Sequence, residues 1–222
     1  MINIAIDGPS SSGKSTVAKL LSKKLNILYL DTGAMYRACG LKAKRLGIDC
    51  LDEAGVSSFI KNIDLQVKYQ DGSQHVYLDG EDVSNEIRKN EVSMLASKIS
   101  SLSIVREKMV EMQREVASVQ PCVLDGRDIC MYVLPNAKYK FFMTANPEIR
   151  AKRRHKELDA KGQTVNFDDL LREINERDYN DSHREFAPLA IAPDAVVIDT
   201  TNLTAEEVVE LIAKEVAKGE AK

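Results

Sequence analysis

The fold is decided by the stretch Gly8-Pro9-Ser10-Ser11-Ser12-Gly13-Lys14-Ser15, which matches the pattern G-x-x-x-x-G-K-[ST]. An apolar segment, Ile2–Asp7, precedes this stretch, and a helical pattern over Lys14–Lys24 follows it. Glycines let backbone N–H groups turn inward, and the start of a helix attracts anions. The order of strand, glycine-rich loop and helix therefore predicts a binding site for a nucleoside triphosphate.

Each position of this loop has an expected role. Lys14 is expected to reach the β- and γ-phosphates, and the Ser15 hydroxyl is expected to bind Mg²⁺. The alternative is a glycine- and serine-rich turn without a ligand, and chance produces the full pattern in a chain of this length only about 1 % of the time. The expected ATP-binding residues are Gly8, Pro9, Ser10, Ser11, Ser12, Gly13, Lys14, Ser15 and Thr16.

Short apolar segments and helical patterns alternate along most of the chain. The five predicted strands are Ile2–Asp7, Ile27–Asp31, Cys122–Asp125, Tyr139–Thr144 and Ala195–Asp199. The helical patterns include Lys14–Lys24, Ala34–Leu46, Ser103–Ser118, Phe167–Tyr179 and Thr204–Lys218. The strands lack strict polar alternation, which is typical of parallel strands covered on both faces. The chain is therefore predicted to form an α/β, doubly wound sheet that binds ligands at the carboxyl ends of its strands.

One stretch departs from this pattern. Its apolar residues alternate with polar ones, namely Ile63, Leu65, Val67, Tyr69, Val76 and Leu78. Asp71-Gly72 separates the two halves and is typical of a type I′ turn, so the stretch predicts an antiparallel hairpin. A second Asp79-Gly80 points to a short third strand. We interpret residues 60–88 as an insert within a single domain that spans residues 1–222.

The composition excludes several classes of protein. The 222 residues are 44 % hydrophobic and 29 % charged, as in ordinary globular chains, and the net charge of −3 favours neither nucleic acid nor a membrane surface as a partner. The longest apolar run, Ile129–Leu134, is too short to span a membrane. No secretory signal is recognised, so we expect a cytoplasmic protein whose four cysteines are reduced and buried.

Arginines near the predicted strand ends indicate a second anion site. The segment Asp31–Arg37 follows the second strand, and Asp125–Asp128 follows the third. Later, Arg177, Asp181 and Arg184 fall at i, i+4 and i+7, which places them on one face of a helix. A surface ion pair would explain any one of these groups alone. Their joint placement at the ligand edge favours a second phosphate-bearing substrate.

Together these segments resemble bacterial cytidylate kinases. The resemblance extends from residue 2 to about residue 218 and includes the hairpin insert. It implies a P-loop core with a five-stranded parallel sheet of order 2-3-1-4-5, helices on both faces, and a helical lid at residues 150–167. It also implies ATP-dependent phosphorylation of CMP and dCMP to CDP and dCDP with Mg²⁺, and we expect a monomer. At Cys130-Met131 the chain departs from the family's usual Gly-Thr, which bears on its fine specificity.

The resemblance implies a role for each residue of the second site. The implied acceptor-phosphate ligands are Thr32, Arg37, Arg127 and Arg184. Ser97, Arg106 and Asp128 are implied to bind cytosine, and Asp181 to bind the ribose hydroxyls with Arg177 beside it. A carboxylate such as Asp128 can accept a hydrogen bond from the amino group of cytosine, whereas uracil presents a carbonyl there. The residues implied to be catalytic are Lys14, Arg127 and Arg184.

The basic run Arg150–Lys156 has three interpretations: a solvated helix face, a nucleic-acid patch, or a lid that closes on ATP. We favour the lid, with Arg150, Arg153 and Arg154 as candidates and Arg153 named as the ATP contact. Asp31 or Asp125 would hold Mg²⁺ through water. Two alternatives for the whole chain stay open, a P-loop kinase acting on an alcohol such as shikimate, and a nucleotide-dependent binding module.

Overall fold

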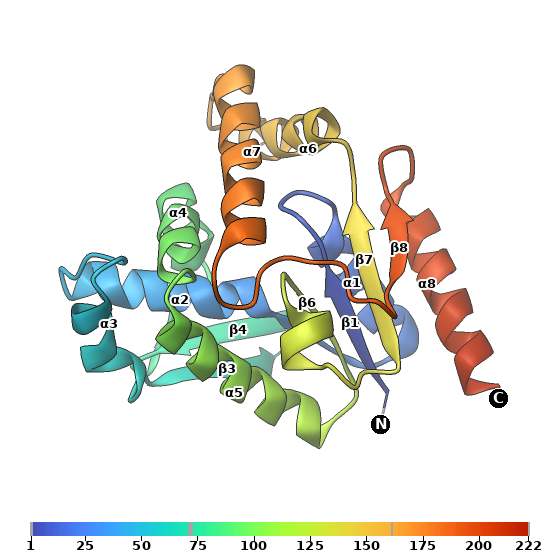
Figure 1. Ribbon diagram of the computed structural model, residues 1–222, viewed down its shortest axis with the longest axis horizontal. Helices are drawn as coiled ribbons and strands as arrows, with labels where there is room; N and C mark the ends of the chain where they lie inside the picture. Colours follow the sequence, from blue (N-terminus) through green and yellow to red (C-terminus); the bar gives the residue numbers. More distant parts are fainter. Residues whose placement is uncertain (1, 71–72, 161, 222) are drawn as a thin grey trace. The chain divides into compact units, whose positions relative to one another are not determined.

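A computed structural model describes residues 2–70, 73–160 and 162–221 of the protein. The chain divides into two compact units. Figure 1 shows the helices and strands of both. The first comprises Met1–Tyr29 and Gln120–Lys222, and the second comprises Leu30–Val119. The predicted turn at Asp71-Gly72 lies outside the described residues.

The main sheet has five strands in the order β2-β6-β1-β7-β8. Their bounds are Asn3–Asp7 for β1, Leu28–Asp31 for β2, Cys122–Gly126 for β6, Tyr139–Thr144 for β7 and Val196–Asp199 for β8. β1 pairs in parallel with β6 and β7, and β7 pairs in parallel with β8. Numbered among the parallel strands alone, the order is 2-3-1-4-5, so the predicted topology is confirmed.

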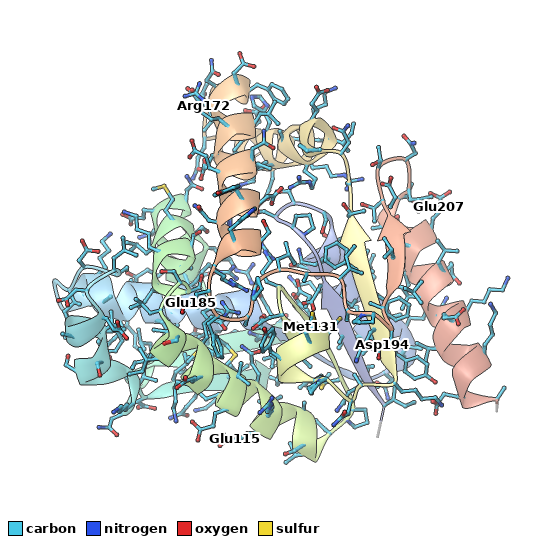
Figure 2. All side chains as sticks on the ribbon, viewed as in Figure 1. Glu115, Met131, Arg172, Glu185, Asp194 and Glu207 are labelled. Atoms are coloured by element: carbon cyan, nitrogen blue, oxygen red, sulfur yellow. The ribbon has the colours of Figure 1, made fainter. Side chains whose placement is uncertain are left out.

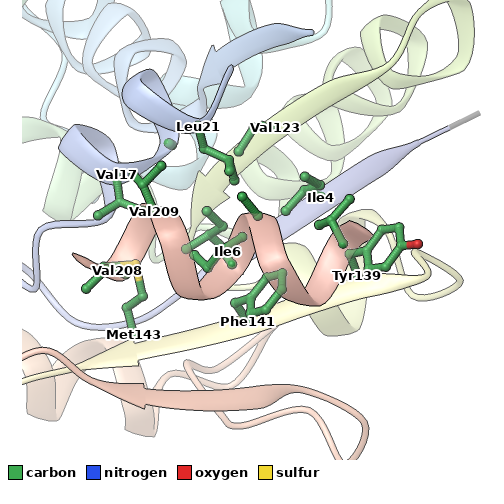
Figure 3. Close-up of a cluster of buried hydrophobic side chains, with 14 of the residues drawn as sticks. Ile4, Ile6, Val17, Leu21, Val123, Tyr139, Phe141, Met143, Val208 and Val209 are labelled. Carbon is green, nitrogen blue, oxygen red and sulfur yellow. The ribbon is translucent and has the colours of Figure 1, made fainter. Parts of the chain in front are cut away.

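Helices α1 and α8 pack against each other and against one face of this sheet (Figure 3). The helices of the first unit are α1 (Lys14–Leu25), the short π-helical turn η2 (Ile129–Val133), α6 (Pro147–Asp159), α7 (Phe167–His183) and α8 (Ala205–Glu220). Ile4 and Ile6 on β1 belong to one buried cluster with Leu21 of α1 and Val209 of α8. Burial of these apolar side chains fixes the position of β1. It also fixes the start of the glycine-rich loop that follows β1, residues 8–15, which we call the phosphate loop.

The second unit carries the inserted hairpin. Its helices are α2 (Thr32–Arg45), α3 (Glu53–Ile60), the 3₁₀ turn η1 (Glu86–Arg88), α4 (Asn90–Ile99) and α5 (Ser103–Val119). β3 (Leu65–Gln70), β4 (Ser73–Leu78) and β5 (Glu81–Asp82) form a three-stranded antiparallel sheet. The predicted hairpin and its short third strand are therefore confirmed.

The four cysteines are free thiols and all are buried, as predicted. Burial raises the pKa of each thiol, to about 12 for Cys39 and Cys122. Within the residues that the structure describes, no helix combines the length and the apolar character that crossing a membrane requires.

Candidate active site

The phosphate loop turns sharply between β1 and α1. Gly8 has no room for a side chain, because a Cβ there would collide with the backbone oxygen of Met143 on β7. Gly13 has a φ of 91° and precedes the first residue of α1, so a left-handed residue ends the loop where the helix begins. The sequence pattern therefore folds as predicted, with glycine at the positions where the backbone admits little else.

Lys14 is folded over this loop. Its side chain is buried, and Nζ donates hydrogen bonds to the carbonyl oxygen of Pro9 at 2.6 Å and to Ser12 Oγ at 3.4 Å. Burial lowers the pKa of Lys14 well below its ordinary value and the nearby Arg127 lowers it further, while Asp125 and Asp7 oppose this shift. Bound phosphate would add negative charge at this place and so favour the protonated lysine.

Ser15 and Asp125 form an oxygen pair beside the loop. Ser15 Oγ donates to Asp125 Oδ2 at 2.8 Å, and the Tyr29 hydroxyl donates to Asp125 Oδ1 at 2.8 Å. Proteins usually hold Mg²⁺ with one or two carboxylates plus substrate phosphates, so a hydroxyl and a carboxylate in contact fit this ion. The other candidate, Asp31, is engaged elsewhere in the second unit, where it caps α2 at Ala34 and pairs with Arg37. Tyr29 was not expected from the sequence.

Asp181 joins two of the predicted arginines. Arg127 Nε donates to Asp181 Oδ2 at 2.8 Å, and Arg184 lies 3.5 Å from Asp181 Oδ1. Burial alone would raise the pKa of Asp181, but the positive charges of Arg127, Arg177 and Arg184 hold it below its ordinary value. The first unit thus gathers partly buried guanidinium groups around one buried carboxylate, a local concentration of positive charge in a chain of net charge −3.

The arginines of the predicted lid lie in different environments. Arg150 is 3 % exposed, donates to the carbonyl oxygen of Ser10 at 3.1 Å and pairs with Asp178 of α7 at 2.6 Å. Arg153 donates to the backbone oxygen of Thr200 at 2.6 Å and to its hydroxyl at 3.1 Å. Arg154 pairs with Glu157 on the same helix, α6.

Thr200 connects Arg153 to the phosphate loop. Its hydroxyl donates to the carbonyl oxygen of Ser12 at 3.0 Å, so Arg153 reaches the loop through one intervening residue. Arg150 contacts the loop directly. Neither contact has a local sequence signal, because Arg150 and Ser10 lie 140 positions apart in the sequence and Arg153 and Thr200 lie 47 apart. That Arg153 binds ATP stays a prediction.

In the second unit the Asp31–Arg37 segment is held by its own side chains and by the hairpin. Arg37 pairs with Asp31 at 2.8 Å, and Thr32 begins α2 and is buried. Gln74 of β4 accepts from the backbone N–H of Asp31 at 2.7 Å and donates to its carbonyl oxygen at 3.3 Å. Burial alone would raise the pKa of Asp31, but Arg37 and the N–H of Ala34 hold it below its ordinary value.

The residues predicted to bind cytosine are divided between the units. Ser97 lies on α4, and Arg106 lies on α5 with its guanidinium carbon 5.2 Å from the centroid of the Tyr36 ring. Arg106 is 1 % exposed and donates to the carbonyl oxygen of Ser100 at 3.1 Å. Asp128 is buried in the first unit, directly before η2.

At Cys130-Met131 the chain differs from the family's usual Gly-Thr, and of these two side chains the first is buried and the second is exposed. Cys130 is buried, with Sγ 3.6 Å from the carbonyl oxygen of Ala5 and 3.7 Å from that of Phe141. Met131 is 39 % exposed (Figure 2). The thiol therefore occupies space between β1 and β7, whereas the methionine adds no bulk to the core.

A lysine at a strand-to-helix turn, with arginines gathered beyond a neighbouring strand, is the arrangement expected of a P-loop kinase. Solved structures agree with this class at the level of the fold. An uncharacterised protein from Eubacterium ventriosum superposes with a TM-score of 0.55 at 14 % identity, covering 98 % of this chain and 99 % of that one. A shikimate kinase from Bacteroides thetaiotaomicron gives 0.50 at 14 % identity, covering 97 % and 98 %.

The chain belongs to the cytidylate kinase family, whose model matches residues 4–218. A cytidylate kinase of Caldicellulosiruptor bescii is 52 % identical over 211 residues, which cover 95 % of this chain and 93 % of that relative. The cytidylate kinase of Clostridioides difficile is 47 % identical, with 96 % and 97 % covered. That of Lactobacillus johnsonii is 46 % identical, with 98 % and 95 % covered. The family named from the sequence motifs is therefore confirmed.

Proposed function

We propose that this protein transfers the γ-phosphoryl group of ATP to CMP or dCMP and releases ADP with CDP or dCDP. The observation that carries the proposal is the cluster of Arg127 and Arg184 around the buried Asp181, in the same unit as the phosphate loop and within a chain of this family. One loop for the triphosphate and one arginine cluster for a second anion correspond to two phosphate-bearing substrates.

The ATP half of the proposed reaction uses the loop residues. Backbone N–H groups of Gly8–Thr16 and the Lys14 ammonium would bind the β- and γ-phosphates. Ser15 and Asp125 would hold Mg²⁺, which neutralises phosphate charge when bound. Arg150 already fixes the Ser10 carbonyl, so its proposed part is to hold the loop in shape while Arg153 contacts the nucleotide.

The acceptor half uses the remaining site residues. Arg127 and Arg184 are proposed to bind the phosphate of CMP, because a guanidinium group matches phosphate geometry with two parallel hydrogen bonds. Thr32 and Arg37 of the second unit are proposed to bind that same phosphate. Asp181 is proposed to accept from the ribose hydroxyls with Arg177 beside it. The residues proposed to bind cytosine are Ser97, Arg106 and Asp128.

Transfer between two phosphates needs no general base. The second pKa of a phosphate monoester is about 6, so the attacking oxygen is already ionised at neutral pH. The work of the protein is then to align two polyanions and to balance their charge while the phosphoryl group moves. Lys14, Arg127 and Arg184 are the cations proposed to do so, within a monomer.

A coupled assay of ADP release across six acceptors tests the proposal. The panel is CMP, dCMP, UMP, AMP, GMP and shikimate, with Lys14→Ala as the inactive control. We expect CMP and dCMP to give the highest kcat/KM. Preferred turnover of shikimate would establish an alcohol kinase instead. Nucleotide binding without multiple turnover of any acceptor would establish a binding module.

A further inference from the structure

Asp7 is a buried carboxylate that the proposed chemistry does not use. It is the last residue of β1, directly before Gly8, and its exposed fraction is 0 %. Burial raises its pKa from 3.8 to about 6, and the neighbouring Asp128 adds to that effect. A buried carboxylate lowers the stability of the fold unless its oxygens are matched by donors, so the partners of Asp7 show what it does.

Both oxygens of Asp7 accept hydrogen bonds from one short segment. Oδ1 accepts from the backbone N–H of Ile129 at 2.8 Å, and Oδ2 accepts from that of Cys130 at 2.7 Å. These N–H groups belong to the two residues that directly follow Asp128. The carbonyl oxygen of Asp128 in turn accepts from the N–H groups of Tyr132 and Val133, at 2.9 and 3.2 Å.

These bonds join the two loops of the proposed reaction within the first unit. On one side, Asp7 is covalently continuous with Gly8 and so with the loop proposed to bind ATP. On the other side, it holds the segment that follows Arg127 and Asp128, which are proposed to bind the acceptor. The Asp7 side chain connects the two segments through two short hydrogen bonds to backbone N–H groups. Backbone atoms have less freedom to move than side chains, so the connection is rigid.

We propose that Asp7 is a positioning residue, which sets the place of Arg127 and Asp128 relative to the phosphate loop. This inference rests on the proposed acceptor roles of those two residues. Asp7 itself would touch neither nucleotide. In-line transfer depends on the placement of the two substrates, and a displacement of about 1 Å can cost roughly 10²-fold in rate.

Substitution of Asp7 by Asn tests this role at constant size. The asparagine amide has one acceptor oxygen where the carboxylate has two. Its NH₂ group would face the backbone N–H of either Ile129 or Cys130, so one hydrogen bond is lost and two donors oppose each other. We expect kcat/KM for CMP to fall by roughly 10- to 100-fold. The dissociation constant of an ATP analogue, measured by calorimetry, should change less than about threefold, because the phosphate loop keeps its own contacts.

The matched control is Asp194→Asn. Asp194 also accepts from a buried group of the same unit, Lys140, through both oxygens at 2.7 and 3.0 Å, but it lies in the segment before β8 (Figure 2). Its loss should lower the melting temperature without changing kcat/KM. Hydrogen exchange gives a readout apart from activity: the amides of Ile129 and Cys130 should exchange at least about tenfold faster in Asp7→Asn, and those of Cys122–Leu124 should not.

Three outcomes would overturn the inference. They are unchanged kcat/KM for CMP in Asp7→Asn, an equal loss of affinity for the ATP analogue, or unchanged exchange at Ile129 and Cys130. Failure of the proposed function is recognised separately, because Asp128→Ala and Arg127→Ala would then leave CMP turnover intact. If those two variants lose activity while Asp7→Asn behaves like the parent, only the positioning role is wrong.

Discussion

The hydroxyl of Ser15 and the carboxylate of Asp125 lie 2.8 Å apart although 110 positions of sequence separate them. The first belongs to the start of α1 and the second to the end of β6, and these elements meet because β6 pairs with β1. Asp125 is fixed from its other side by the hydroxyl of Tyr29. The pair is therefore oriented before any ion binds, which limits the entropy that binding would cost.

Ser15→Ala and Asp125→Asn should both raise the Mg²⁺ concentration needed for half-maximal activity. Each variant removes one oxygen ligand or its charge from a site for a hard cation. Ser22→Ala is the matched control, because Ser22 lies on the same helix and its hydroxyl donates to the backbone oxygen of Lys19. The measurement is a titration of MgCl₂ at fixed ATP and CMP. Identical Mg²⁺ curves for all three variants would remove Ser15 and Asp125 from the metal site.

Lys14→Ala should lower kcat/KM by roughly 10²-fold or more, because the proposed contact of this buried cation with the transferring phosphate would act where little water screens it. The fold should persist, since Nζ donates to the loop itself, at the Pro9 carbonyl and Ser12 Oγ. Lys19→Ala, an exposed position on the same helix, serves as the control. Steady-state kinetics and circular dichroism check both variants, and near-parental turnover in folded Lys14→Ala would contradict the role.

Asp128→Ala should reduce the preference for CMP over UMP. The carboxylate favours the amino group of cytosine and repels the carbonyl of uracil. Loss of a hydrogen bond that involves a charged group costs about 1.5–3 kcal/mol, which is a change of roughly 10- to 100-fold in the ratio of kcat/KM values. Competition assays with CMP and UMP measure this ratio in the variant and in the parent. An unaltered ratio would mean that Asp128 does not bind the base.

Asp181→Ala and Arg184→Ala should separate recognition of the sugar from recognition of the phosphate. Loss of Asp181 should raise KM more for CMP than for a dideoxy analogue, which lacks the hydroxyls. Loss of Arg184 should lower kcat/KM for both acceptors by roughly 10²-fold. Arg172→Ala, on the exposed part of α7 (Figure 2), is the control. If both variants shift only the melting temperature, the cluster has a structural role alone.

Asp7→Asn should change how stability depends on pH. The folded pKa of Asp7, about 6, lies above its ordinary value of 3.8, so the folded protein binds the extra proton between these values. The contribution of Asp7 to the free energy of unfolding is therefore fully present below about pH 4 and is lost as the pH rises to about 6. Relative to Asp7→Asn, the parent should therefore lose about 3 kcal/mol of unfolding free energy across this window. Urea titrations at several pH values measure the difference, and a constant difference would contradict the burial of a charged Asp7.

Much of the fold could be predicted because its signals are local. The five apolar runs, the loop pattern and the Asp-Gly hairpin each depend on neighbouring residues. The helical pattern predicts a helix from Ala34, but α2 begins at Thr32, because Asp31 caps it and its side chain accepts from the N–H of Ala34. An aspartate directly before a helical pattern is a helix-start signal that the sequence itself carries.

The proposal of Asp125 rather than Asp31 as the metal residue agrees with the predicted strand order. That order puts the third strand beside the first, so Asp125 is the aspartate at the end of the neighbour of the loop strand. By contrast, the role of Asp7 could not be predicted from the sequence. Its partners are backbone N–H groups, which no residue type identifies. The burial of Arg150 depends on Asp178 and on the Ser10 carbonyl, both distant along the chain.

The four buried thiols have a practical consequence. Maleimides and related reagents react with thiolates, and burial raises the pKa of all four cysteines, so few thiolates exist at neutral pH. A fluorophore or spin label should therefore attach selectively to one cysteine introduced at an exposed position in each unit. The natural chain can then be labelled without removing Cys39, Cys50, Cys122 or Cys130, and distances between the units can be followed by resonance energy transfer as nucleotides are added.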